Sequence, residues 1–277
     1  MMIQNSDTLD YTSIQPQTPW SGYIAVDDTK LFVQDTGGSG IPIVYLNGQF
    51  ANTSYWERVI DELGSDFRHI TYDERARGTK SGTSSDYSFD TCVKDVDVVL
   101  ASRNIKKCIV VGWSYGAFLA AHWASRNPDS CIGAVLIDGA QPYDWMTDEM
   151  AKSISRLFKW LYPVVWLLRP TGITPRMSSS EMAETNIELG WLARVDKLMP
   201  VMENIVVPTR YVLASGTSFG SKGNEQELIR TGCNLVVQRN YNIKIAAKVK
   251  SNHGKILKKD FRVIADTIRE IKTINKI

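Results

Sequence analysis

A serine flanked by two glycines stands where a predicted strand passes into a predicted helix. The sequence reads Gly112-Trp113-Ser114-Tyr115-Gly116, which has the G-x-S-x-G spacing of a nucleophile elbow. An apolar run at 108–111 precedes it, and an amphipathic run follows it. Because glycines leave room for neighbouring backbone, they allow a tight turn that exposes the serine hydroxyl at a helix N-terminus. The pattern predicts nucleophilic chemistry at Ser114.

A serine hydroxyl becomes an effective nucleophile only when a base accepts its proton, and histidine is the usual base. The chain contains three histidines. We expect His69 to pack within a strand and His122 to pack within the helix that follows the elbow. His253 lies in a turn just after the last predicted strand, and it follows Ser114 in the chain. His253 is therefore the predicted base.

An acidic residue should hold the second ring nitrogen of that histidine. The loop after the strand at 210–214 is the usual place, but residues 215–224 contain no carboxylate. Asp138 directly follows the strand predicted at 131–137, and we favour it as the acid. Glu225 is the alternative, and Asp144 is a third and less favoured candidate.

Strands and helices alternate along the chain between these polar turns. Apolar or alternating runs predict strands at 23–26, 31–34, 41–46, 67–72, 108–111, 131–137, 210–214 and 243–249. This alternation favours an α/β fold with a mostly parallel central sheet of about eight strands and helices on both faces. Ligands bind such sheets beyond the carboxyl ends of the strands, where Ser114, Asp138 and His253 are all expected.

Residues 141–205 interrupt the alternation, because this stretch has helical periodicity and is rich in aromatic residues. We interpret it as an inserted helical cap. Residues 21–140 and 206–277 then form the core, and 1–20 is a polar N-terminal segment. An aromatic cap suggests an apolar substrate group, and three tryptophans are candidate substrate-binding residues: Trp113, Trp145 and Trp166.

The composition is that of an ordinary globular protein, with 43% hydrophobic residues, 22% charged residues and a net charge of +2 over 277 residues. This charge gives no reason to expect nucleic acid or an anionic membrane as a partner. The N-terminal segment lacks the pattern of a signal peptide, and the longest apolar run is too short for a membrane span. Four cysteines without paired spacing predict reduced thiols and a cytoplasmic location. No metal-ligand spacing is present, so we expect neither a metal nor a cofactor.

Together these residues resemble the α/β-hydrolase fold superfamily, in its serine esterase or lipase-like branch with a cap domain, over about residues 23–274. The family's His-Gly turn and the tryptophan of the next helix correspond to the run Asn47-Gly48-Gln49-Phe50 and to Trp56. By this match, the backbone N–H of Tyr115 and that of Gln49 or Phe50 would form the oxyanion hole.

The chain departs from the family pattern at three places. Asn47 stands where histidine is common, and its amide is expected to orient the oxyanion loop. Ala76 replaces a glycine in the family's Asp-x-Arg-Gly-x-Gly turn, which spans residues 73–78 here. The common aspartate after the seventh strand is missing. Some family members place the acid after the sixth strand instead, where Asp138 stands.

The resemblance implies a hydrolase that cleaves a carboxylic ester or a lactone of a small, largely apolar molecule through an acyl-enzyme on Ser114. Serine at the elbow argues against dehalogenase and epoxide-hydrolase chemistry, for which the family uses aspartate. Two alternatives remain. One is different chemistry on the same scaffold, namely C–C bond hydrolysis, acyl transfer or a lyase reaction. The other is a non-catalytic ligand-binding protein.

Overall fold

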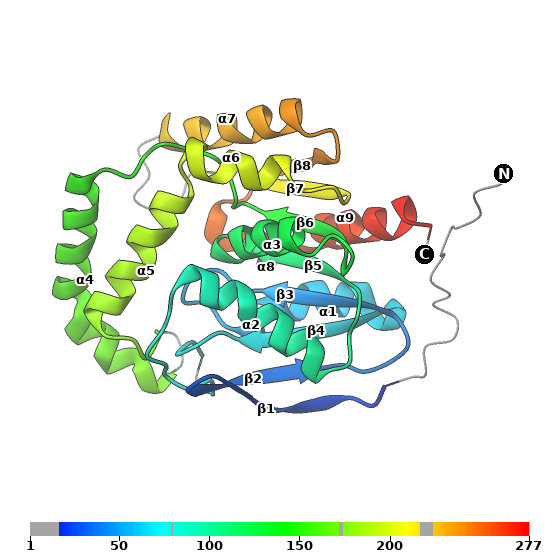
Figure 1. The fold of residues 1–277 in the computed structure, drawn as a ribbon, viewed down its shortest axis with the longest axis horizontal. Helices are drawn as coiled ribbons and strands as arrows, with labels where there is room; N and C mark the ends of the chain where they lie inside the picture. Colours follow the sequence, from blue (N-terminus) through cyan, green and yellow to red (C-terminus); the bar gives the residue numbers. More distant parts are fainter. Residues whose placement is uncertain (1–16, 79, 172–173, 217–223, 277) are drawn as a thin grey trace.

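Eight strands form one sheet within the residues that the computed structural model describes, which are 17–78, 80–171, 174–216 and 224–276. The strand order is β1-β2-β4-β3-β5-β6-β7-β8. β2 runs antiparallel to both β1 and β4, and every other pairing is parallel. The sheet is therefore mostly parallel with helices around it, as the sequence predicted (Figure 1).

The strands are β1 (Trp20–Val26), β2 (Thr29–Asp35), β3 (Ile41–Leu46), β4 (Phe67–Asp73), β5 (Cys108–Trp113), β6 (Cys131–Ile137), β7 (Thr209–Ala214) and β8 (Ile243–Val249). The helices are α1 (Glu57–Leu63), α2 (Phe89–Ser102), α3 (Tyr115–Arg126), α4 (Asp148–Leu168), α5 (Ser179–Leu192), α6 (Val195–Glu203), α7 (Asn224–Arg239), α8 (Ile256–Lys259) and α9 (Phe261–Ile274).

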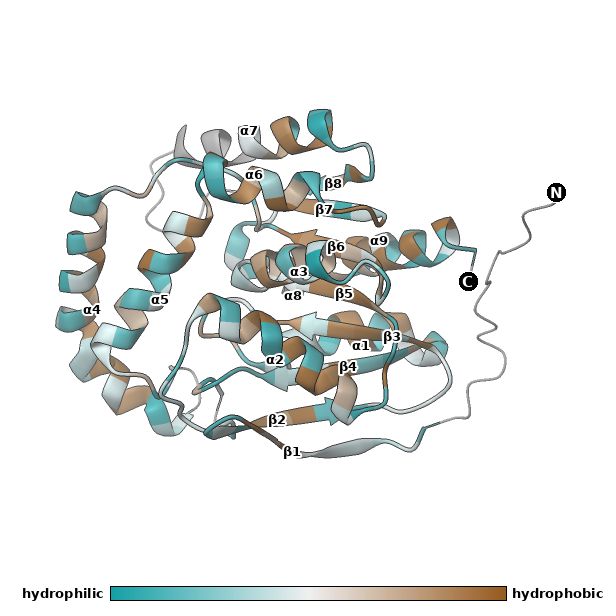
Figure 2. Cartoon of the chain, in the orientation of Figure 1, coloured by the Kyte–Doolittle hydropathy of each residue, from teal (hydrophilic) through white to brown (hydrophobic). Residues whose placement is uncertain are grey.

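The central strands are buried on both faces, as continuous apolar runs predict for parallel strands. Successive residues of β3 point into different cores, since side chains alternate along a strand. Val44 and Leu46 pack in the core that includes residues of α2, α3 and α6. Ile43 and Tyr45 pack in the core that includes residues of α1 and α9. Figure 2 shows these central strands as largely hydrophobic.

Three helices, α4, α5 and α6, occupy the chain between β6 and β7. α4 and α5 lie beyond the carboxyl ends of the parallel strands (Figure 1). α5 begins with a capping box, in which the Ser178 hydroxyl accepts from the Glu181 amide and the Glu181 carboxylate accepts from the Ser178 amide. None of the described helices is long and apolar enough to cross a membrane.

The two histidines that were expected to pack in the fold are both buried. The ring nitrogens of His69 lie 2.9 Å from the Tyr45 hydroxyl and 2.8 Å from the Gly64 carbonyl oxygen. His122 packs edge-on against Phe89, with 4.8 Å between the ring centroids. All four cysteines are buried thiols that are not joined in disulfides among the described residues.

The burial of His122 leads to a prediction about stability. Burial, assisted by the positive charge of Arg126, lowers the pKa of His122 from its usual 6.5 to about 4. Between these values the unfolded chain binds a proton that the folded chain does not. The free energy of unfolding should therefore fall by about 3 kcal/mol from this residue alone as the pH drops from 6.5 to 4.

His122→Leu should remove this part of the pH dependence. Urea unfolding of both proteins at several pH values between 4 and 7 measures it. The difference in unfolding free energy between the wild type and the variant should change by about 3 kcal/mol over that range. A constant difference would contradict the expected pKa shift.

Candidate active site

Ser114 lies at the turn between β5 and α3, in a backbone conformation that residues other than glycine rarely adopt. Its φ is 56° and its ψ is −117°. A Cβ added at Gly112 would overlap the Gly116 carbonyl oxygen, and one added at Gly116 would overlap the Leu46 carbonyl oxygen. The two glycines of the motif therefore allow the elbow to pack against itself and against the end of β3.

The structure brings Ser114, His253 and Asp138 together in one hydrogen-bonded chain. His253 Nε2 lies 2.9 Å from Ser114 Oγ, and His253 Nδ1 lies 2.7 Å from Asp138 Oδ2. A carboxylate can only accept, so Nδ1 carries the proton and Nε2 is free to accept from the serine hydroxyl. This is the arrangement that a serine needs for its activation by a general base.

The sheet order explains how three residues far apart in the sequence meet. Ser114 follows β5, Asp138 follows β6 and His253 follows β8, and these strands end at the same edge. The amide of Ala214, at the end of β7, donates to Asp138 Oδ1 at 3.0 Å. One carboxylate oxygen is thereby held by the backbone, and the other is left to face the histidine.

The other two acid candidates are placed differently. Glu225 lies in the first turn of α7, and its side chain is outside the described residues. Asp144 is exposed, and its carboxylate accepts from the backbone amide of Val195 at 2.9 Å. Of the acid candidates whose side chains the structure describes, Asp138 is the one that contacts His253.

Asn47 fixes the start of the loop that follows β3. Its side-chain nitrogen donates to the Tyr72 carbonyl oxygen at 2.7 Å and to Glu74 Oε2 at 3.0 Å, and its backbone amide donates to Glu74 Oε1. Its side-chain oxygen accepts from the Trp56 indole at 2.8 Å. Burial raises the pKa of the Glu74 carboxyl, and the nearby charge of Arg77 opposes this rise. Asn47 therefore ties the loop to β4 and to the residue that precedes α1.

Of the predicted oxyanion residues, Tyr115 directly follows Ser114 in the chain, and Gln49 and Phe50 follow Asn47. Tyr115 is the first residue of α3, so its N–H has no partner within the helix. Phe50 has a φ of 65°, and its ring packs edge-on against Phe158 of α4. The side chain of Gln49 donates to the Thr185 hydroxyl at 3.2 Å. α4 and α5 therefore both contact this loop.

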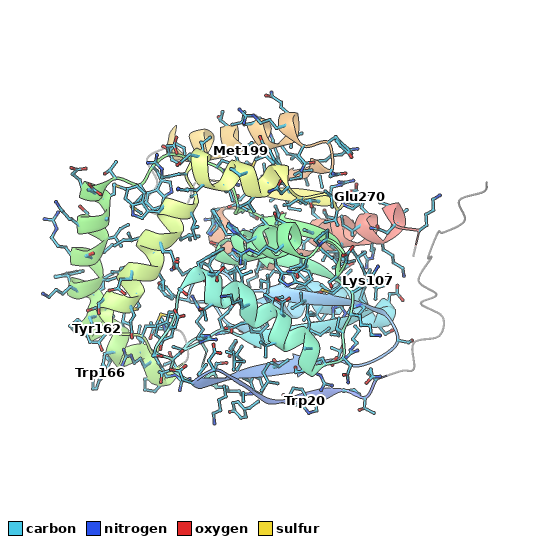
Figure 3. The ribbon with its side chains drawn as sticks, viewed as in Figure 1. Trp20, Lys107, Tyr162, Trp166, Met199 and Glu270 are labelled. Atoms are coloured by element: carbon cyan, nitrogen blue, oxygen red, sulfur yellow. The ribbon has the colours of Figure 1, made fainter. Side chains whose placement is uncertain are left out.

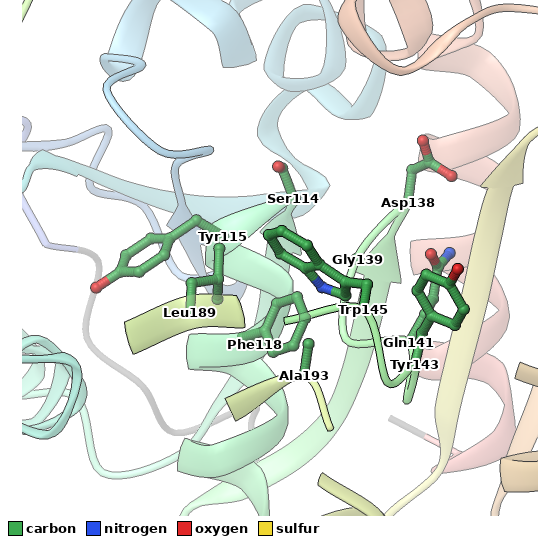
Figure 4. Close-up of a pocket in the computed structure, with 10 residues that line it drawn as sticks. All are labelled: Ser114, Tyr115, Phe118, Asp138, Gly139, Gln141, Tyr143, Trp145, Leu189 and Ala193. Carbon is green, nitrogen blue, oxygen red and sulfur yellow. The ribbon is translucent and has the colours of Figure 1, made fainter. Parts of the chain in front are cut away.

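A cavity of about 240 Å³ opens beside Ser114 (Figure 4). Most of its wall is apolar, formed by residues of α3, of the C-terminal end of α5 with its cap residue, and of the segment after β6: Tyr115, Phe118, Leu189, Ala193 and Trp145. Gln141 and Tyr143 add polar atoms to the wall. Gln141 is buried, and its side-chain nitrogen has no hydrogen-bond partner among the described residues. The sequence pattern did not point to Gln141.

The three candidate tryptophans have different positions. Trp145 lines the cavity. Trp113 is buried, and its ring packs against Gly48 of the loop that follows β3 and stacks on Tyr55, with 5.5 Å between the ring centroids. Trp166 lies on α4, is 61% exposed and does not line the cavity beside Ser114 (Figure 3). The structure brings only Trp145 to the cavity.

Comparisons with known proteins give the same fold. A profile of the alpha/beta hydrolase fold family matches residues 41–169. The chain is 29% identical over 125 residues to the uncharacterized protein YqjL of Bacillus subtilis, covering 43% of this chain and 49% of that protein. It is 24% identical over 142 residues to a haloalkane dehalogenase of Mesorhizobium japonicum, covering 51% of this chain and 46% of the dehalogenase. The chain thus spans about half the length of these curated relatives.

A solved enol-lactonase from Burkholderia xenovorans superposes with a TM-score of 0.70 at 17% identity, covering 91% of this chain and 100% of the lactonase. This structural likeness extends beyond the segment that the family profile matches. Residues 41–169 match the alpha/beta hydrolase fold family, and the chain as a whole has the α/β-hydrolase fold.

Proposed function

We propose that this protein is a serine hydrolase that cleaves an ester-type bond, a carboxylic ester or a lactone, of a small and largely apolar substrate. The hydrogen-bonded chain from Ser114 through His253 to Asp138 carries the proposal. The strained backbone of Ser114 at a helix N-terminus supports it further. Serine at this position is inconsistent with the aspartate chemistry expected of dehalogenases in this family.

In the proposed reaction, Ser114 Oγ attacks the substrate carbonyl carbon while His253 Nε2 accepts its proton. The N–H groups of Tyr115 and of Gln49 or Phe50 stabilise the negative charge on the carbonyl oxygen. His253 then gives the proton to the leaving alcohol, and an acyl-enzyme remains. A water molecule, deprotonated by His253, attacks the acyl-enzyme and releases the acid.

Residues 141–205 act as the cap in this proposal. Trp145 and Leu189, which line the cavity, come from this segment. A cavity of about 240 Å³ with mostly apolar walls suits a small acyl or alcohol group. The cytoplasmic location that the cysteine pattern suggested stays a prediction.

Labelling with a fluorophosphonate tests the nucleophile. The wild type should become covalently labelled, and Ser114→Ala should not. Ser215→Ala is the matched control, because Ser215 follows β7 and its hydroxyl donates to the Val249 carbonyl oxygen instead of a histidine. Mass spectrometry of the labelled peptide measures the site. An unlabelled wild type would favour a non-catalytic binding protein, and labelling without turnover of any ester would favour other chemistry on the scaffold.

Asp138→Asn tests the acid. The Ala214 amide requires an oxygen opposite it, so the new NH₂ group would face His253 Nδ1. The histidine would then have to adopt the other tautomer, which cannot accept the serine proton. We expect kcat to fall on the order of 10⁴-fold.

Glu225→Gln and Asp144→Asn are the controls for this substitution, and each should change kcat by less than about threefold, since Asp138 is the acid in this proposal. Steady-state hydrolysis of an activated ester measures all three variants. Asp138→Asn that stays within a few-fold of the wild type would remove Asp138 from the mechanism, and a large loss in Glu225→Gln would assign the acid to Glu225.

The unpaired amide of Gln141 refines the expected substrate. A buried donor without a partner is unfavourable by about 1–3 kcal/mol, and this one belongs to a residue that lines a mostly apolar cavity beside Ser114. A substrate whose acyl chain carries a hydrogen-bond acceptor would pair with it. Such a substrate should be preferred over an apolar analogue of the same length.

Gln141→Leu should reduce this preference by roughly tenfold or more. The kcat/KM values of the p-nitrophenyl esters of levulinate and pentanoate measure it, because the two acyl chains differ by one ketone oxygen. The variant should lose activity mainly towards levulinate. An equal loss towards both esters would show that Gln141 has only a structural role.

A further inference from the structure

The outer face of α4 carries a stripe of exposed apolar side chains, which we call the α4 stripe: Leu157, Trp160, Val164, Leu167 and Leu168. These positions follow the helical repeat, so the side chains lie along one side of the helix. Trp160 is 77% exposed and Leu167 is 69% exposed. Scattered apolar residues are normal on a protein surface, but a contiguous stripe marks an interaction site.

The stripe is not needed for the packing of α4 on the rest of the chain. The inner face of the helix makes that contact through Phe158, Tyr162 and Val165, which pack against a cluster that includes Met177 and Met182. α4 is the outermost helix of this part of the molecule, and Trp166 also projects from it to solvent (Figures 1 and 3). The helix therefore has two apolar faces, of which the protein itself covers one.

Positive charge flanks the stripe. Lys152, Arg156 and Lys159 lie on the same helix, are exposed and form no ion pair with any described residue. Residues 150–180 contain five lysines and arginines and no aspartate or glutamate. The whole chain has a net charge of only +2, so this cationic segment is a local feature that the overall composition does not reveal.

We propose that α4 is an interfacial helix that docks this protein on a lipid bilayer with anionic headgroups. Exposed tryptophan and leucine on one face, beside lysine and arginine, are the features of helices that lie in the plane of a membrane interface. The apolar side chains enter the boundary between headgroups and acyl chains, and the cations contact the lipid phosphates.

A second copy of this chain fits the stripe less well. In a symmetric dimer through α4, the two apolar stripes would meet, and the three cations beside each stripe would lie at the same interface. The carboxylates of α4, Asp148 and Glu149, are confined to its first turn, and residues 150–180 contain none. Like charges brought together in this way oppose association. The charge pattern therefore favours an anionic surface over self-association.

Flotation of the full-length protein with vesicles tests the proposal. The wild type should bind vesicles of mixed phosphatidylglycerol and phosphatidylcholine, and should bind phosphatidylcholine alone more weakly. Trp160→Ser combined with Leu167→Ser should lower the partition coefficient by about tenfold or more. Tyr241→Ser is the matched control, because Tyr241 is an exposed aromatic residue before β8, and it should bind as the wild type does.

A second pair of variants tests the contribution of charge. Substitution of Lys152, Arg156 and Lys159 by glutamine should weaken binding to the anionic vesicles about tenfold or more. The same change at Lys244, Lys248 and Lys250, which are exposed on or just after β8, removes equal charge elsewhere. This control should stay within about twofold of the wild type, since electrostatic attraction to the surface falls off within a Debye length.

Several results would overturn the proposal. These are a wild type that binds no anionic vesicles, α4 variants that bind as well as the wild type, and a β8 control that loses as much binding as the α4 variant. A wild-type dimer that Trp160→Ser with Leu167→Ser converts to a monomer, without vesicle binding, would identify the stripe as a contact between copies. Ser114→Ala should bind vesicles normally, so membrane docking and the proposed hydrolysis can fail independently.

Discussion

The close approach of α3 to the end of β3 is the constraint on which the candidate site depends. Gly116 packs directly on the backbone of Leu46 and Asn47, and Gly112 packs on Gly116. This contact places Ser114 and the loop that follows β3 side by side, although about 65 residues separate them in the sequence. Only backbone without side chains fits there, so both glycines of the motif have a structural reason as well as a chemical one.

A buried polar cluster keeps that loop in place from the other side. Asn47 uses both ends of its amide and its backbone N–H, and its partners Glu74 and Trp56 are themselves buried. A buried hydrogen bond is stronger because the dielectric constant around it is low. For the same reason, loss of one partner would destabilise the fold strongly. The resemblance pointed to Asn47 as a departure from histidine. Its partners become visible only when β3, β4 and the start of α1 are brought together.

Much of the fold followed from sequence patterns, since all eight predicted strands are present near their predicted positions. Asp138 and His253 could be placed because parallel strands end at a common edge. Side-chain direction could not be obtained in the same way. α4 is apolar on two faces, so its periodicity does not say which face packs inward. The exposed position of Trp166 and the unpaired amide of Gln141 depend on tertiary packing that no local pattern encodes.

The contact between Phe50 and Phe158 has a consequence for the modularity of this fold. Phe50 belongs to the loop that follows β3, and Phe158 belongs to α4. An exchange of α4 for a segment from another protein would therefore also change the support of the loop that follows β3. In this chain, recombination or engineering of α4 has to treat this helix and the loop after β3 as one unit.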